Sequence, residues 1–391
     1  MRKIIFCFVV LLSSITIAQT AQDSISSDPN QQINGVQRLL SGNFGKAVTL
    51  GSYAELTYTQ AESENAELDI PRLVVLVGYK FDERTQFVAE IEFEHIKELA
   101  VEQAFVNYAL TDNVNLRGGL MLIPMGIINE YHEPTTFNGT LRPGLDTQII
   151  PSTWRELGVG VSGRFPNISL GYQAYVFNGL KSVTADGSNI EGLLLGDNGI
   201  RNGRQSAAKS TLNTPTFSAK LDYYGLPGIR LGLSGYYGNS QAEDEIEEID
   251  GATIGITMVA LDARYAFRRF TARGEFVYGS LADTNQYNIL TGEDLGSAMM
   301  GFYVEGAYNL LPLRAKQRLF AFARYEKYDT HAATEGDLLR NDVYNRQDIT
   351  TGLSYHIANG VVLKGDYQFR TNAVDGGNVR DQLNFGIGAW F

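Results

Sequence analysis

The sequence predicts an all-β fold, a single transmembrane antiparallel up-and-down β-barrel of about 16 strands with an inward-folded third loop. Three observations lead to this prediction. Apolar and charged residues alternate with a period of two in many segments, tight turns alternate with long polar loops, and aromatic residues gather at both ends of the apolar faces. Helical patterning is confined to a short piece around residues 32–40.

The composition excludes several classes of protein. The 391 residues carry a formal net charge of −12, which argues against nucleic acid as a partner because that interaction depends on concentrated Lys and Arg. The single cysteine, Cys7, excludes a disulfide framework. Mean hydropathy is −0.14, a value that a membrane barrel can have because its lipid-facing and lumen-facing residues cancel in the average.

The N-terminus is typical of a secretory signal peptide. Arg2 and Lys3 precede an apolar stretch, and small residues follow it at Ala18 and Ala21. The prediction is therefore a signal peptide over residues 1–18, with cleavage after 21 as an alternative, then a periplasmic N-terminal extension over 19–47. Residues 48–391 are predicted to form the transmembrane barrel.

The alternation is clear in residues 86–95, where odd positions are apolar and positions 90, 92 and 94 are glutamates. Residues 259–267 show the same pattern, with Asp262 and Arg264 on the charged face. Runs of this type predict strands that start near Thr49, Arg72, Gln86, Ala100, Val114, Arg155, Ile168, Thr216, Ile229, Thr253, Phe270, Met299, Arg318, Asp348, Val361 and Gln382. Tight turns such as Asp112-Asn113 alternate with long polar loops, as in outer-membrane barrels.

A secreted β-sandwich would also show alternating strands, but it has no use for two aromatic girdles. Aromatic residues lie near the short turns, as at Phe81 and Phe267, and near the long loops, as at Phe93 and Tyr237. The chain also ends inside an alternating strand with Phe391, which resembles the terminal signal of outer-membrane barrels.

Two motifs carry a family resemblance. Residues 117–126 (RGGLMLIPMG) and 150–158 (IPSTWRELG) resemble the strand-to-loop segment and the loop return of the phosphate-selective porin O and P family. Residues 102–108, residues 324–326 and the C-terminal strand are further matches. The resemblance covers most of the mature chain. It implies a homotrimeric outer-membrane channel whose third long loop folds into the lumen.

A barrel of this size is too wide for its own side chains to fill, so residues 126–154 are predicted to narrow it. Charges of both signs on this loop and the wall would create a transverse field that selects solutes. The predicted lining residues are Glu130, His132, Glu133, Arg142, Asp146, Arg155, Arg117, Arg264, Arg273 and Arg324.

The predicted function is passive diffusion of small hydrophilic or charged solutes across the outer membrane, with both chain termini in the periplasm, no enzymatic activity, no cofactor and no metal. Phosphate is one candidate solute, although lumen acids outnumber the arginines and the loop contains no lysine. The alternative is a structural or adhesive barrel with a plugged lumen that presents long loops such as 179–215. An outer-membrane hydrolase built on Ser354 and His356 is a third possibility, for which no orienting acid can be identified.

Overall fold

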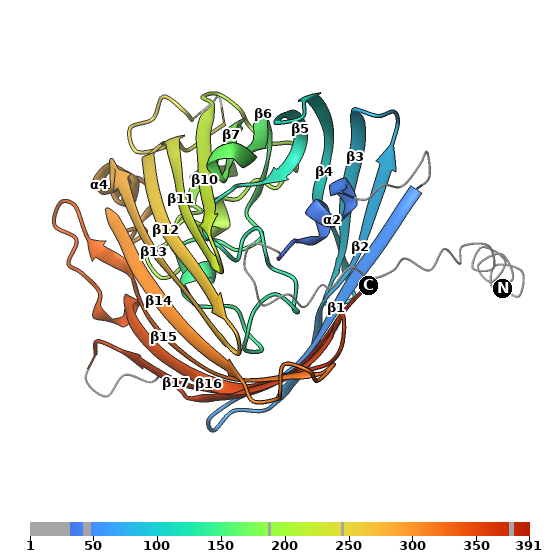
Figure 1. Ribbon diagram of the computed structural model, residues 1–391. Coiled ribbons are helices and arrows are strands. Elements are labelled where there is room, and N and C mark those ends of the chain that lie inside the picture. Colours follow the sequence, from blue (N-terminus) through green and yellow to red (C-terminus); the bar gives the residue numbers. More distant parts are fainter. Residues whose placement is uncertain (1–31, 42–47, 187–188, 244–245, 375–378) are drawn as a thin grey trace, which may run out of the picture.

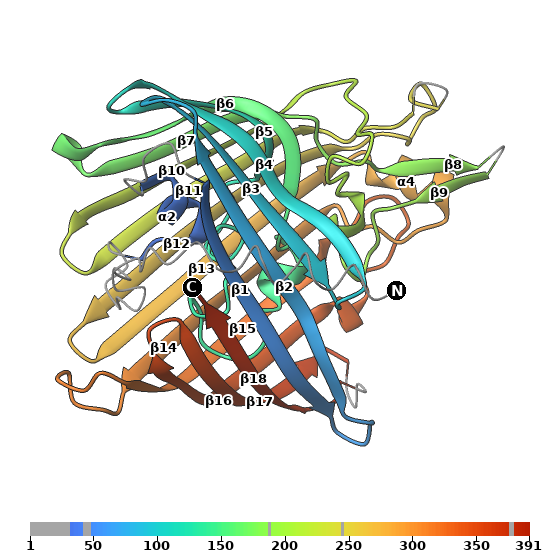
Figure 2. The same ribbon diagram turned by 90° about the vertical axis from the view of Figure 1, so that its right-hand side faces the viewer.

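The computed structural model describes residues 32–41, 48–186, 189–243, 246–374 and 379–391; the predicted signal peptide lies outside them. Sixteen antiparallel strands close into one barrel in which each strand pairs with its neighbours along the chain (Figures 1 and 2). The barrel strands are β1 (Val48–Ala61), β2 (Glu67–Lys80), β3 (Thr85–Glu94), β4 (Glu98–Thr111), β5 (Val114–Leu122), β6 (Arg155–Phe165), β7 (Leu170–Phe177), β10 (Thr216–Leu226), β11 (Ile229–Asn239), β12 (Gly255–Phe267), β13 (Phe270–Ala282), β14 (Ala298–Asn309), β15 (Arg318–Ala333), β16 (Asn345–Ala358), β17 (Val361–Asn372) and β18 (Gln382–Trp390).

The predicted fold class is confirmed. Every predicted strand start falls close to an observed one, and the largest difference is at β2, predicted near Arg72 and observed from Glu67. β1 closes the barrel by pairing with β18, with Tyr53 opposite Trp390. This closure leaves no unpaired strand edge, which is the condition for a sheet to stand in lipid.

The outward face of the wall is apolar, as the alternation predicts. Phe81, Phe267 and Phe391, at the short-turn end, are 54%, 57% and 78% exposed. Tyr237, near the long-loop end, is 65% exposed. These side chains meet lipid or its interface in a membrane and would not be exposed in a soluble sandwich.

A β-bulge in β4 turns two consecutive polar residues into the barrel. Glu90 pairs with Gln103 and Ile91 pairs with Val101, so Glu102 is an extra residue between them. Both Glu102 and Gln103 are buried. The strict alternation places only one of them inward, and the bulge provides the exception because it offsets the register by one residue.

The described part of the chain also contains short helices and 3₁₀ turns. They are α2 (Gly35–Ser41), α3 (Leu145–Gln148), α4 (Thr284–Thr291), and the 3₁₀ turns η1 (Pro166–Ile168), η2 (Arg201–Gly203) and η3 (Asp342–Tyr344). None of the helices in the described part of the chain is long and apolar enough to cross a membrane.

Residues 32–41 correct one expectation about the N-terminal segment. The sequence predicts a periplasmic extension over 19–47, but α2 lies inside the barrel beside the first strands (Figure 1). Val36 and Leu39 are buried there, and Gly78 on β2 leaves room for Leu39. The physical reason is that α2 has an apolar side, which the barrel wall covers.

The loop between β7 and β10 packs against neighbouring segments at the long-loop end of the barrel. Residues 178–215, between β7 and β10, include the hairpin β8 (Val183–Asp186) and β9 (Asn189–Gly192), which the sequence does not predict. Leu180, Leu194 and Ile200 of this loop are completely buried and join one large apolar cluster with Trp154 and Tyr287. The loop is therefore packed against its neighbours.

Candidate pore constriction

Residues 123–154, between β5 and β6, enter the lumen and are called the inner loop below (Figure 1). Asn129 closes the base of this loop. Its amide nitrogen donates to the carbonyl oxygens of Ile123 at 2.7 Å and Trp154 at 3.1 Å, and its side-chain oxygen accepts from the Trp154 amide at 2.8 Å. One buried side chain thus bonds to both ends of the inner loop.

Gly126 begins the inward turn. It has φ +64°, a conformation that favours glycine, and a Cβ atom there would collide with the Glu275 carboxylate. Its backbone amide donates to Ser234 Oγ on β11 at 3.2 Å.

Carboxylates of the opposite wall accept hydrogen bonds from the inner loop. Four strands each offer one acceptor to a loop N–H group. The contacts are Ile127 N to Glu275 on β13, Asn138 Nδ2 to Glu305 on β14, Gly144 N to Glu326 on β15 and Thr140 N to Asp366 on β17. Hydrogen bonds to charged acceptors contribute about 1.5–3 kcal/mol each, so these acids hold the loop in place.

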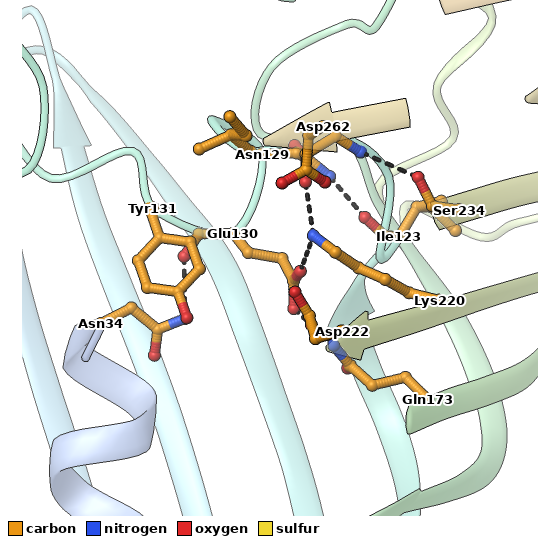
Figure 3. A network of polar contacts seen from close by, with 12 residues as sticks. Asn34, Ile123, Asn129, Glu130, Tyr131, Gln173, Lys220, Asp222, Ser234 and Asp262 are labelled. Carbon is orange, nitrogen blue, oxygen red and sulfur yellow. Dashed lines mark hydrogen bonds and ion pairs between the residues drawn. The ribbon is translucent and has the colours of Figure 1, made fainter. Parts of the chain in front are cut away.

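Lys220 on β10 makes the closest ionic contact with the loop. Its Nζ lies 2.6 Å from Glu130 Oε2 and also donates to the Gly126 carbonyl, while Gln173 donates to Glu130 Oε1 at 2.6 Å (Figure 3). Lys220 is 1% exposed. Lys220 is absent from the predicted lining residues, although the alternation through 216–223 places it on the same face as Asp222.

Two predicted loop residues, His132 and Glu133, are buried against the wall and α2. Burial alone would lower the pKa of His132, but the carboxylates of Glu102 and Glu90 raise it to about 10. Burial raises the pKa of Glu133 to about 6, despite its partners. Glu133 accepts a hydrogen bond from Gly35 N at 2.7 Å, and Asn34 donates to the Glu130 carbonyl at 2.8 Å, so α2 is bonded to the loop.

Arg142 and Asp146 also lie within the barrel. Arg142 donates to the His132 carbonyl at 3.3 Å, and burial lowers the pKa of its guanidinium to about 10. Asp146 is 0% exposed and has no hydrogen-bond partner for either carboxylate oxygen. It therefore sits behind the loop surface and cannot meet a passing solute directly.

Arg155 does not line the constriction, in contrast to the prediction. It shares strand parity with Leu157 and Val159, which are 41% and 61% exposed on the outward face of β6. Its guanidinium donates to the Thr153 carbonyl at 3.4 Å. Glu156 is the inward residue at this position, and it accepts from Asn178 at 2.9 Å.

The four predicted wall arginines all face the lumen. Arg117 donates to Asn107 at 2.9 Å and to Tyr175 at 3.3 Å. The others contact carboxylates: Arg264 lies 3.5 Å from Asp222, Arg273 lies 3.0 Å from Glu305, and Arg324 lies 3.0 Å from Glu326.

Two cavities open toward the short-turn end. One of about 390 Å³ lies beside α2 and is lined by Asn34, Arg117 and Glu130 among others. The second, of about 110 Å³, is lined by Gln32, Tyr131 and Arg273 among others. Asn34 and Glu130 border the first cavity, and the adjacent residues Gln32 and Tyr131 border the second.

The barrel resembles several solved outer-membrane proteins. The anion-selective porin from Comamonas acidovorans matches with 12% identity and a TM-score of 0.58, covering 88% of this chain and 99% of that chain. The outer membrane channel DcaP of Acinetobacter baumannii matches with 12% identity and a TM-score of 0.57, covering 90% and 99%. The trimer form of OmpT from Vibrio cholerae matches with 10% identity and a TM-score of 0.55, covering 88% and 99%.

No known protein-family profile matches the chain. A curated relative, an uncharacterized protein of Aquifex aeolicus (strain VF5), is 32% identical over 347 residues, which cover 82% of this chain and 75% of the relative. The chain has the 16-strand barrel fold of outer-membrane porins, and it belongs to the same family as this A. aeolicus protein.

Proposed function

We propose that the protein is an outer-membrane porin that lets small hydrophilic solutes diffuse passively and that prefers anions, with phosphate among the candidates. The observation that carries this proposal is the inner loop, which narrows a closed 16-strand barrel without filling it. The two cavities beside the loop, and the wall carboxylates that hold it, support a polar passage along the loop.

The anion preference rests on the charges that line the two cavities. The larger one has Arg117, Arg164 and Arg230 with Asp112, Glu130 and Asp222, and the smaller one has Arg264, Arg273 and Arg318 with Glu305 alone. Arginines therefore outnumber acids by six to four in the linings of the two cavities. The count of lumen acids in the sequence includes Glu275, Glu326 and Asp366, which bond to the inner loop and line neither cavity.

The orientation and assembly are part of the same proposal. Val48 and Phe391 lie at the short-turn end, which is the periplasmic end in barrels of this kind, so both termini of the barrel are assigned there. We further propose a homotrimer, in line with the trimer form of OmpT. Size-exclusion chromatography with light scattering in detergent tests the trimer.

Reversal potential in a KCl gradient across a planar bilayer tests the function. We expect ohmic steps whose reversal potential indicates chloride preference. Arg117→Ala is expected to reduce this preference, because Arg117 bonds to the neutral side chains of Asn107 and Tyr175 and lies over the Phe105 ring, so its loss removes no ion pair with these partners. Arg155→Ala is the matched control, since Arg155 faces outward and its removal is expected to leave selectivity unchanged.

Two outcomes contradict the proposal. A correctly folded protein that shows no conductance would favour the alternative, a structural or adhesive barrel whose lumen is plugged by α2 and the loops. If the unmodified protein and the Arg117→Ala variant both conduct with a preference for potassium, the anion assignment is wrong.

A further inference from the structure

Four polar side-chain atoms, one each from Tyr53, Glu90, Glu102 and His132, lie close together where the inner loop touches the first strands. His132 Nε2 lies 3.5 Å from Glu90 Oε1, 3.5 Å from Glu102 Oε2 and 3.0 Å from the Tyr53 hydroxyl. The Tyr53 hydroxyl lies 2.8 Å from Glu90 Oε1 and 3.2 Å from Glu102 Oε2. Five of the six distances among these four atoms thus lie between 2.8 and 3.5 Å.

These spacings are close to those of a tetrahedral metal site. Ligands at about 2.0–2.1 Å from a zinc ion stand about 3.3–3.4 Å from one another. The imidazole nitrogen and the two carboxylate oxygens come from three separate elements, the inner loop, β3 and β4, and all lie within 4.8 Å of one another. The β-bulge at Glu102 is what turns the third of them inward.

The tautomer of His132 suits a metal ligand. Its Nδ1 lies 3.0 Å from the Asn129 carbonyl oxygen, which can only accept, so Nδ1 carries a hydrogen. A metal ion would replace the proton on Nε2, and the lone pair of Nε2 would then bind the ion together with the two carboxylates. A histidine fixed by a backbone carbonyl behind it is the usual support of a metal-bound imidazole.

The charge in this pocket is unbalanced. Glu90, Glu92 and Glu102 are each at most 2% exposed. Among the described residues, Arg72 is the one arginine or lysine within 4 Å of any of them, and it pairs with Glu92 at 3.3 Å. Glu102 Oε1 is buried without a hydrogen-bond partner. Two carboxylates thus share His132 as their cationic partner, and a divalent cation would match their charge.

We propose that the protein binds one divalent transition-metal ion here, with Glu90, Glu102 and His132 as ligands and the Tyr53 oxygen in the fourth position. Zinc fits best, because Ca²⁺ takes six to eight oxygen ligands and Mg²⁺ requires an octahedron, whereas mixed nitrogen and oxygen ligands in a tetrahedron suit Zn²⁺. The ion joins the inner loop to the wall of the barrel.

Metal content tests the proposal. The folded full-length barrel in detergent is stripped with a chelator, loaded with Zn²⁺, desalted and analysed by inductively coupled plasma mass spectrometry. We expect about one zinc per chain in the unmodified protein and less than about 0.1 in His132→Ala and Glu102→Gln. His356→Ala is the control, since His356 lies on β16 away from the pocket, and it is expected to keep the full zinc content.

Loading with Co²⁺ provides a second measurement that needs no variant. A tetrahedral site gives intense visible absorption, whereas six-coordinate cobalt on surface carboxylates absorbs weakly. The proposal fails if the unmodified protein retains no zinc, if His132→Ala retains as much as the unmodified protein, or if bound cobalt has the weak six-coordinate spectrum. Heat-modifiable migration on gels establishes that each variant is folded.

Discussion

Lys220 on β10 and Glu130 on the inner loop form an ion pair of 2.6 Å in the interior of the barrel, ninety residues apart in the chain. This pair and the Gly126 carbonyl contact fix the first turn of the loop to the wall. Because Lys220 is completely enclosed, its charge has no access to water as a substitute partner.

Removing one member of this pair should destabilise the loop. We expect Lys220→Met to lower the free energy of unfolding by about 3–5 kcal/mol, because Glu130 keeps a buried charge without its cation. The double variant Lys220→Met, Glu130→Gln should recover part of that loss. Urea unfolding in lipid vesicles measures both, and Lys327→Met, on the exposed face of β15, is the control. Equal stability of Lys220→Met and the unmodified protein would contradict the assignment.

The hydrogen bonds of Asn129 that join the two ends of the inner loop should keep the whole loop ordered. Asn129→Ala leaves the buried Trp154 amide and the Ile123 carbonyl with fewer partners, at a cost of about 1–3 kcal/mol for each unsatisfied group. Since Trp154 lies at the loop base, its fluorescence in a Trp390→Phe background should shift to longer wavelength as water enters. An unchanged spectrum with unchanged protease resistance of residues 130–150 would show that the loop does not need the Asn129 hydrogen bonds to stay ordered.

The helix α2 should restrict the passage. Deletion of residues 32–41 removes the lining of one side of the 390 Å³ cavity, so we expect single-channel conductance to rise by about twofold or more. Asn34→Ala removes the bond to the Glu130 carbonyl and the bond that Asn34 Oδ1 accepts from Gln37 N at 2.8 Å, and it should increase current noise with a smaller change in mean conductance. If the deletion variant folds and conducts as before, α2 lies outside the ion path.

The strands could be predicted from the sequence because lipid and water impose their periodicity residue by residue. Leu261 and Asp262 are neighbours with opposite environments, 52% and 4% exposed, and no distant contact is needed to expect this. The same parity rule, applied to Leu157 and Val159, assigns Arg155 to the outward side of β6. Lys220 could have been found in the same way.

The course of the inner loop could not be predicted, because its partners are distant in the chain. Ile127 bonds to Glu275 across 148 positions, and Thr140 bonds to Asp366 across 226. Nothing local distinguishes these wall acids from those that face water. The position of α2 could not be predicted for the same reason. Its helical pattern is visible in residues 32–40, but the sequence does not show its contacts with Glu130 and Glu133, which are distant in the chain.

Asp146 should make stability depend on pH. Burial raises the pKa of its carboxyl to about 7, with Glu326 adding to the rise and Arg273 and Arg324 opposing it. In the unfolded chain the group ionises near pH 4. Between about pH 4 and pH 7 the unfolded state therefore loses its proton while the folded state keeps it, and the free energy of unfolding falls as the pH rises.

Asp146→Asn removes this dependence, because the amide has nearly the same shape and no charge to bury. The variant should match the unmodified protein at pH 4 and exceed its stability at pH 8 by up to about 4 kcal/mol, the value of a shift of about three pH units. Denaturant midpoints at both pH values measure the difference, with Asp112→Asn, on an exposed turn, as the control. A variant that is less stable than the unmodified protein at pH 8 would mean that the Asp146 charge is held by Arg273 and Arg324 and stabilises the fold.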